Sequence, residues 1–299
     1  MNILLFGKTG QVGWELQRAL APIGNVIALD VHSEMYCGDF SDPKGVAETV
    51  RRIKPDVIVN AAAHTAVDKA ESERDFAQLL NATSVEAIAK AAADINAWLI
   101  HYSTDYVFPG TGDTPWSEVD ETAPLNIYGE TKLAGEKAIQ AYCPNHLIFR
   151  TSWVYASKGN NFAKTMLRLA KERQELSVIN DQFGAPTGAE LLADCTAHAI
   201  RTALVKPDVA GLYHLVASGT TTWYDYANLV FEEARAAGIK LAIEKLNAVG
   251  TNAYPTAARR PLNSRLNTTK FQQNFDLVLP TWEVGVKRML VELFSTSTV

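Results

Sequence analysis

The first hundred residues alternate short, wholly apolar runs with longer segments of helical period, and this alternation constrains the fold more than any other feature. The runs and segments follow one another as residues 2–6, 12–20, 26–29, 43–53, 57–60, 76–93 and 98–103. Strands that are apolar throughout suit a parallel sheet covered by helices on both faces. With right-handed crossovers, the pattern predicts an α/β fold with a doubly wound parallel sheet.

Two helix starts carry capping signals, and the second half of the chain is less regular. Asp42 precedes Pro43 as an N-cap before a first-turn proline, and Asn126 is placed to begin a helix that carries Tyr128. Beyond about residue 151, helices are predicted only near residues 162–172, 189–202 and 282–293. We therefore expect a sheet domain over residues 1–152 and a smaller lobe over 153–299, parts of which can return to the first domain.

Composition excludes several classes of partner. The net charge is −5, and lysine and arginine are spread along the chain, so neither nucleic acid nor an anionic membrane is expected as a partner. The apolar stretches near the start are too short for a signal peptide or a membrane span, which predicts a cytoplasmic protein. Cys37, Cys143 and Cys195 have neither disulfide nor zinc-site spacing. A small molecule is the expected partner.

A glycine-rich turn follows the first predicted strand and opens the first predicted helix. Without Cβ atoms, such a turn lets backbone N–H groups and the positive helix end approach a pyrophosphate. A tight strand-to-helix turn is the alternative, but the N-terminal position favours a Rossmann-type dinucleotide site. The residues expected to bind the dinucleotide here are Gly7, Thr9, Gly10, Gln11, Val12 and Gly13.

Asp30 ends the second predicted strand about 20 residues beyond the turn, where a carboxylate can accept hydrogen bonds from the adenosine ribose. This favours NADH. Lys8 lies in the glycine turn and can offset a 2′-phosphate, so the cofactor is predicted to be NADH or NADPH. A solvated surface lysine is the alternative for Lys8.

Further contacts with the dinucleotide are expected from two segments. Asp39 can accept from the adenine amino group with Phe40 packed nearby, although a helix-capping turn also explains this pair. Ala62, Ala63 and His64 follow the third strand, and the small side chains there let a cofactor lie against the backbone. Close helix packing would also favour alanines.

Tyr128 and Lys132 lie four residues apart, on one face of the predicted helix. Thr104 ends the fourth predicted strand, at the sheet edge where the nicotinamide would lie. Reduction of a ketone needs a hydride on carbon and a proton on oxygen. We assign Tyr128 as proton donor, Lys132 as the cation that lowers the phenol pKa and binds the nicotinamide ribose, and Thr104 as donor to the substrate oxygen.

With these motifs the chain resembles the extended short-chain dehydrogenase/reductase family over nearly its whole length. Four blocks are similar to the members that reduce dTDP-linked 4-keto-6-deoxyhexoses: residues 103–108, 126–129, 150–155 and 181–187. The resemblance implies hydride transfer to the C4 keto group of such a nucleotide sugar, giving dTDP-L-rhamnose. It also implies a homodimer.

Other activities within the family are weighed against this one. The dehydratases place Asp-Glu after the threonine, whereas Tyr106 follows Thr104 and Asp105 here, so the acid–base pair for elimination is incomplete. Sugar-nucleotide epimerisation stays open. A non-enzymatic regulatory subunit similar to the methionine adenosyltransferase beta subunit also stays open, because intact motifs permit catalysis without proving it.

Candidates for substrate binding lie mainly in the second half of the chain. Tryptophans can wall the sugar and base, although core packing is their commoner role, and an arginine suits the diphosphate. The residues expected to bind substrate are Thr104, Asp105, Trp153, Gln182, Thr187, Trp223 and Arg259, with Arg260 beside the last.

Glu190 and Asp194 stand four residues apart on a predicted helix, and Glu15 lies on the first helix. Paired oxygen ligands of this kind can hold Mg²⁺, and the resembled reductases are associated with magnesium. A solvated acidic helix face is the alternative. Any metal here is expected to be structural, because hydride transfer with a tyrosine donor does not need one.

Overall fold

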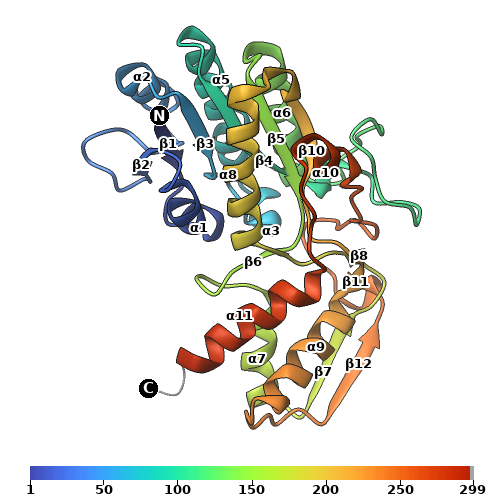
Figure 1. Cartoon of the computed structure of the whole chain (residues 1–299). Helices are drawn as coiled ribbons and strands as arrows, with labels where there is room; N and C mark the ends of the chain where they lie inside the picture. The colour runs from blue at the N-terminus through green and yellow to red at the C-terminus, as the bar shows by residue number, and fades with distance from the viewer. Residues whose placement is uncertain (297–299) are drawn as a thin grey trace.

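The computed structural model describes residues 1–296, and at its centre lies a six-stranded sheet in the order β10-β5-β4-β3-β1-β2 (Figure 1). Every neighbouring pair of strands is parallel. The strand order reverses between β1 and β3, where open α/β sheets bind ligands at the carboxyl edge. The predicted doubly wound parallel sheet is confirmed. Its strands are β1 (Asn2–Phe6), β2 (Asn25–Leu29), β3 (Val57–Asn60), β4 (Trp98–Thr104), β5 (His146–Thr151) and β10 (Gly211–His214).

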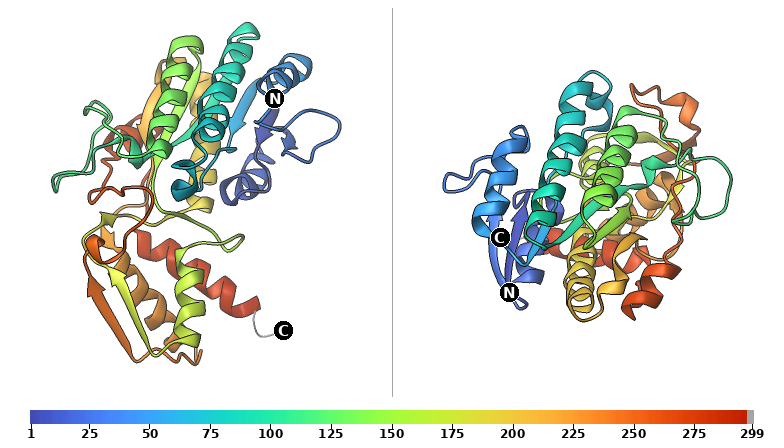
Figure 2. Two further views of the ribbon diagram at one scale, coloured as in Figure 1. Left: turned by 180° about the vertical axis from the view of Figure 1, so that it is seen from behind. Right: turned by 90° about the horizontal axis from the view of Figure 1, so that it is seen from above.

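Helices cover both faces of the sheet, as the views in Figure 2 show. Alternate residues of β1 enter different cores: Ile3 and Leu5 pack with α1 and α8, whereas Leu4 and Phe6 pack with α2 and α5. One face carries α1 (Gln11–Leu20), α8 (Ala189–Val205) and α10 (Thr269–Phe275); the other carries α2 (Pro43–Ile53), α5 (Ser84–Asp94) and α6 (Ile127–Tyr142).

A smaller lobe lies below the sheet in Figure 1 and has its own apolar core. Three helices pack around a two-stranded parallel sheet: α7 (Phe162–Glu172), α9 (Trp223–Ala236), α11 (Trp282–Thr296), β7 (Glu175–Ile179) and β12 (Lys245–Val249). Two short strand pairs are β6 (Val154–Tyr155) with β9 (Thr187–Gly188), and β8 (Phe183–Gly184) with β11 (Thr221–Thr222). No helix in the described part of the chain has the length and apolar character needed to cross a membrane.

The remaining elements are short: α3 (Val67–Ala70), α4 (Arg74–Gln78), the π-helical turn η1 (Leu79–Thr83) and the 3₁₀ turns η2 (Asp105–Val107), η3 (Pro207–Val209) and η4 (Thr251–Ala253). The helical segment predicted over residues 76–93 is confirmed as a helical run over residues 74–94, in which the π turn η1 separates α4 from α5. The π turn aims Asn81 inward, where its amide bonds to the backbone of His64 and to Thr131.

Both predicted helix caps are confirmed. The Asp42 carboxylate accepts from the Gly45 amide at 2.9 Å, and the Asn126 side chain accepts from the Gly129 amide at 2.9 Å. Helix α9 was not predicted, although Thr222 caps it by accepting from the Asp225 amide at 3.0 Å. The buried residues of α9 follow helical spacing on one face (Tyr226, Ala227, Val230, Phe231 and Ala234), so both its cap and its apolar stripe were available in the sequence.

Candidate active site

The glycine turn between β1 and α1 has room only for glycine at two positions. Gly7 has a φ of +86°, and a Cβ there would lie 2.7 Å from the Ala61 carbonyl carbon. A Cβ on Gly13 would lie 1.9 Å from the Gly7 carbonyl oxygen. Helix α1 starts at Gly10 with no side-chain cap and no acidic residue in its first turn. This bare, positive helix end fits the pyrophosphate of a dinucleotide.

Asp30 follows β2 at the same edge of the sheet and stays ionised. Burial alone would raise its pKa, but the Ser33 hydroxyl, the His32 amide and the Lys8 ammonium together hold that pKa below its usual value. The Ser33 hydroxyl donates to Asp30 at 3.0 Å, and Lys8 Nζ lies 3.6 Å from the carboxylate. A carboxylate acceptor and a lysine therefore lie side by side where the adenosine ribose of a dinucleotide would reach.

The other residues predicted to contact the dinucleotide lie close to this edge, in different environments. Asp39 accepts from the Ser41 amide at 2.8 Å, while the Phe40 ring is buried edge-on against Phe6. Phe40 can therefore offer a ligand its backbone rather than its ring. The chain after β3 is held by Asn60, which accepts from the Ala62 amide at 3.0 Å, and Ala62 and Ala63 are half-buried.

His64 is turned toward helix α4. Its Nε2 lies 2.9 Å from Glu73, and its ring packs edge-on against Phe76. Its backbone amide donates to Asn81 at 2.8 Å. The imidazole therefore packs among helix side chains, and the backbone is the part of His64 closer to the sheet edge.

Three predicted catalytic residues converge where β4 ends and α6 begins. The Asn126 cap starts α6, and Glu71 also accepts from the Ile127 amide at 2.9 Å, which fixes the helix end that carries Tyr128. The Thr104 side chain lies close enough to the Tyr128 phenol to lower the pKa of the phenol. Lys132, one turn further along α6, donates to the carbonyl of Tyr102 in β4 at 2.6 Å.

The phenol of Tyr128 keeps its proton in this arrangement. Burial raises its pKa to about 12; the Thr104 side chain lowers it, and the Asp105 charge raises it. Lys132 is not among these causes, since its Nζ bonds to Tyr102 and His101 instead. Burial dominates the pKa of Tyr128 here, and the role of Lys132 toward the phenol stays a prediction.

Asp105 is buried beside Thr104 and is a second proton-carrying group. Burial raises its pKa to about 7, against hydrogen bonds with Ser264 and Thr104 that lower it. The Thr104 hydroxyl lies 3.1 Å from Asp105 Oδ1 and accepts from the Tyr106 amide at 3.2 Å. Thr104 thus links the carboxyl group of Asp105 to the phenol of Tyr128.

Of the residues predicted to bind substrate, three form a group in the smaller lobe. The Trp153 and Trp223 rings stack at 3.6 Å between centroids, and Gln182 accepts from the Trp223 indole at 3.0 Å. Trp153 has a φ of +48°, a left-handed conformation that is uncommon for a non-glycine residue. The structure therefore joins these side chains into one aromatic wall.

Thr187 and Arg259 do not join that wall. The Thr187 side chain is fully buried, and its hydroxyl donates to Ala185 and accepts from the Ala217 amide. Arg259 is exposed, and its backbone carbonyl accepts from Asn126 at 2.8 Å, beside the start of α6. Arg260 instead pairs with Asp68 at 2.8 Å.

Sequence reasoning missed a set of buried polar residues behind the site. They are Asn60, Asn81, His101 and Glu136, all 1% exposed or less. A polar side chain inside an otherwise apolar strand was the available signal for Asn60 and His101. Asn81 depended on the π turn, which has no clear sequence signature.

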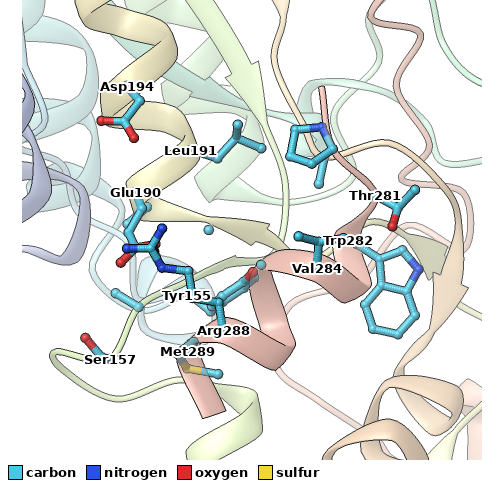
Figure 3. A pocket seen from close by; sticks show the side chains of 16 residues that line it. Tyr155, Ser157, Glu190, Leu191, Asp194, Thr281, Trp282, Val284, Arg288 and Met289 are labelled. Atoms are coloured by element: carbon cyan, nitrogen blue, oxygen red, sulfur yellow. Dashed lines mark ion pairs between the residues drawn. The ribbon is translucent and has the colours of Figure 1, made fainter. Parts of the chain in front are cut away.

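A separate pocket lies between α8 and α11, lined by Tyr155, Glu190, Asp194 and Arg288 among others (Figure 3). The magnesium prediction falls here, and the structure does not support it. Arg18 bonds to both Glu15 and Asp194, at 3.2 and 2.9 Å, and Arg288 lies 3.5 Å from Glu190. Across residues 1–296 no group of three metal-ligating side chains is placed to hold an ion, and arginines pair with these acids instead.

Known proteins resemble this chain over its full length. It is 83% identical to a dTDP-4-dehydrorhamnose reductase of Escherichia coli K12, with all of both chains covered. A dTDP-4-dehydrorhamnose reductase structure from Clostridium acetobutylicum superposes with a TM-score of 0.88 at 34% identity, covering 98% of this chain and 99% of that one. One from Bacillus anthracis in complex with NADP gives 0.86 at 35%, covering 97% and 99%.

A family model described as the RmlD substrate binding domain matches residues 1–295. Its match includes the glycine turn, the β4 edge, the start of α6 and the aromatic wall. The chain therefore belongs to the RmlD substrate binding domain family.

Proposed function

We infer that this chain transfers hydride from NADH or NADPH to the C4 keto group of a dTDP-linked 4-dehydro-6-deoxyhexose, giving dTDP-L-rhamnose. The observation that carries this is the convergence of Thr104, Tyr128 and Lys132 at the carboxyl edge of β4, in a chain 83% identical to a dTDP-4-dehydrorhamnose reductase. The aromatic wall of Trp153 and Trp223 is assigned to the nucleotide sugar.

The residues divide the reaction between them. When bound, the reduced nicotinamide supplies the hydride that reaches the C4 carbon. Tyr128 gives its phenol proton to the C4 oxygen as negative charge develops there. Thr104 places its hydroxyl beside that oxygen, and the Lys132 amine, from one turn further along α6, supports the phenolate that remains. Thr104 and Lys132 are buried and Tyr128 is partly buried, which limits the access of water to the proton transfer.

Both reduced cofactors suit the adenosine end of the site. Asp30 can accept from ribose hydroxyls, while Lys8 can pair with a 2′-phosphate, and the Bacillus anthracis relative was crystallised with NADP. A homodimer remains a prediction from the family resemblance, and a cytoplasmic location remains a prediction from the short apolar stretches near the start of the chain. Size-exclusion chromatography with light scattering tests the first.

The test is a spectrophotometric assay for consumption of NADH and of NADPH with dTDP-4-dehydro-6-deoxy-L-mannose, beside its GDP and UDP counterparts. We expect turnover with the dTDP sugar. Tyr128→Phe is the matched control, because it removes only the donated proton, which is typically worth ~10²- to 10⁴-fold in rate. Nucleotide binding by this variant, measured by NADH fluorescence, should persist.

Each alternative has its own signature in the same assay. An epimerase would invert a sugar carbon without net use of cofactor. A regulatory subunit would bind the dinucleotide and turn over none of the three sugars. Either result would contradict the reductase.

A further inference from the structure

We propose that His101 is a positioning residue for Lys132. The His101 ring donates its Nε2–H to Lys132 Nζ, which orients the amine and favours its neutral form. His101 lies in the middle of β4 and Lys132 on α6, and the two nitrogens are 3.2 Å apart. The inference deepens the proposed function and rests on the role given there to Lys132.

The tautomer of His101 follows from its other neighbour. Asn60 is buried in β3, and its amide oxygen accepts from the Ala62 backbone at 3.0 Å. Its amide nitrogen therefore faces His101 Nδ1, at 3.1 Å. An amide nitrogen only donates, so Nδ1 must accept, and a neutral ring then carries its one proton on Nε2.

Burial keeps the His101 ring neutral. The side chain has no exposed surface, and this burial lowers the pKa of His101 well below its usual value. A neutral ring with Nδ1 accepting has a single proton to give. That proton points along the Nε2 to Nζ contact.

Only the neutral amine can accept that proton. An ammonium has three donors and no lone pair, so it would oppose the Nε2–H, whereas an amine accepts it and still donates to the Tyr102 carbonyl. Burial acts in the same direction and lowers the pKa of Lys132 to about 8, against the charge of Glu136.

The other groups around the amine come from the same helix and from β5. Glu136 lies one turn beyond Lys132 on α6 and is paired with Arg150 of β5, while Tyr128 lies one turn before. Of these, the Glu136 carboxylate favours the ammonium, so His101 and Glu136 act in opposite directions on one amine. Together, His101 and Glu136 set the pH below which Lys132 carries the charge that supports the Tyr128 phenolate.

The tautomer is tested directly by a long-range ¹H–¹⁵N correlation spectrum of the uniformly labelled full chain. The His101 signals are assigned as those lost in His101→Gln. We expect a neutral ring with Nε2 protonated and Nδ1 unprotonated from about pH 6 to about pH 9. A ring protonated on Nδ1, or one that becomes cationic in this range, would overturn the proposal. This readout needs no substrate, so it decides even if the proposed activity fails.

The pH profile of turnover tests the consequence for Lys132. In His101→Gln, the carboxamide can turn its oxygen toward Nζ and favour the ammonium, so the alkaline limb of kcat/KM should move up by about one pH unit, a tenfold change in acid dissociation. The matched control is Leu99→Val, a packing change on the same face of β4. If His101 has only a structural role, His101→Gln should lower kcat and leave the alkaline limb of kcat/KM in place, as is expected for Leu99→Val. That result would also refute the inference.

Discussion

Glu136 on α6 and Arg150 on β5 form a bidentate ion pair that is almost completely buried. Arg150 donates from Nε and Nη2 to the two carboxylate oxygens at 2.9 and 2.7 Å, and the two side chains are 4% and 1% exposed. The guanidinium also lies 4.9 Å from the centre of the Phe108 ring. Since Glu136 follows Lys132 by one turn, the ion pair places a fixed charge beside the catalytic amine.

Arg150→Met should strongly destabilise the fold, because it leaves the Glu136 carboxylate buried without a partner. Breaking a pair of this kind typically costs about 3–5 kcal/mol. The double variant Glu136→Leu/Arg150→Met removes the orphaned charge and should lose less. Urea denaturation of all three proteins measures the difference, and equal losses in the single and double variants would contradict the expectation.

Gly13→Ala should weaken both the fold and the binding of a dinucleotide. Its Cβ would lie 1.9 Å from a backbone oxygen of the glycine turn, so the turn or α1 must move, at a cost of about 1–3 kcal/mol. Gly10→Ala is the matched control for stability, since its Cβ would meet Gly7 at an ordinary 3.5 Å and its backbone is extended. We expect it to stay within about 1 kcal/mol of the natural chain. Thermal unfolding and NADH titration compare the two, and similar losses would argue against the close contact.

Asp105 should make the protein less stable as pH rises toward neutrality. Its folded pKa, raised to about 7 by burial, exceeds the unfolded value, so the folded state holds a proton that the unfolded state has released. The stability contribution is present at low pH, falls as pH rises between about 4 and 7, and amounts to at most about 4 kcal/mol. Asp105→Asn should remove this slope.

The measurement is the free energy of unfolding in urea at about pH 5 and about pH 8 for both proteins. All other titratable groups are the same in both proteins, so the difference between the two slopes isolates Asp105. Parallel slopes would show that the carboxyl group is ionised throughout, and would remove Asp105 as a proton-carrying neighbour of Thr104.

Asp30→Asn should shift the cofactor preference toward NADPH. The ionised Asp30 would repel a 2′-phosphate, while Lys8, 3.6 Å away, would attract it. Removing the charge should raise the ratio of kcat/KM for NADPH over NADH by about tenfold, or ~1.4 kcal/mol. Asp39→Asn is the control, because adenine is common to both nucleotides and this ratio should not change. A ratio unaffected in Asp30→Asn would place the ribose elsewhere.

Much of the fold was readable from local sequence. Apolar runs separated by amphipathic segments predicted the parallel sheet, and Asp42 and Asn126 predicted two helix starts, because capping and periodicity act within a few residues. The glycine spacing depends on one turn, and Tyr128 and Lys132 share a face of one helix, so both features could be predicted from local sequence.

The sequence by itself thus determined the doubly wound architecture and the glycine turn, and it predicted Tyr128 as the proton donor. Only the tertiary structure decided which charges surround that donor: Lys132 contacts His101, and Glu136 pairs with Arg150. It also decided that arginines form ion pairs with the acids predicted to bind magnesium. The reason is physical. Hydrogen bonding and burial set the state of a charged group, and both depend on partners from strands and helices far apart in the chain.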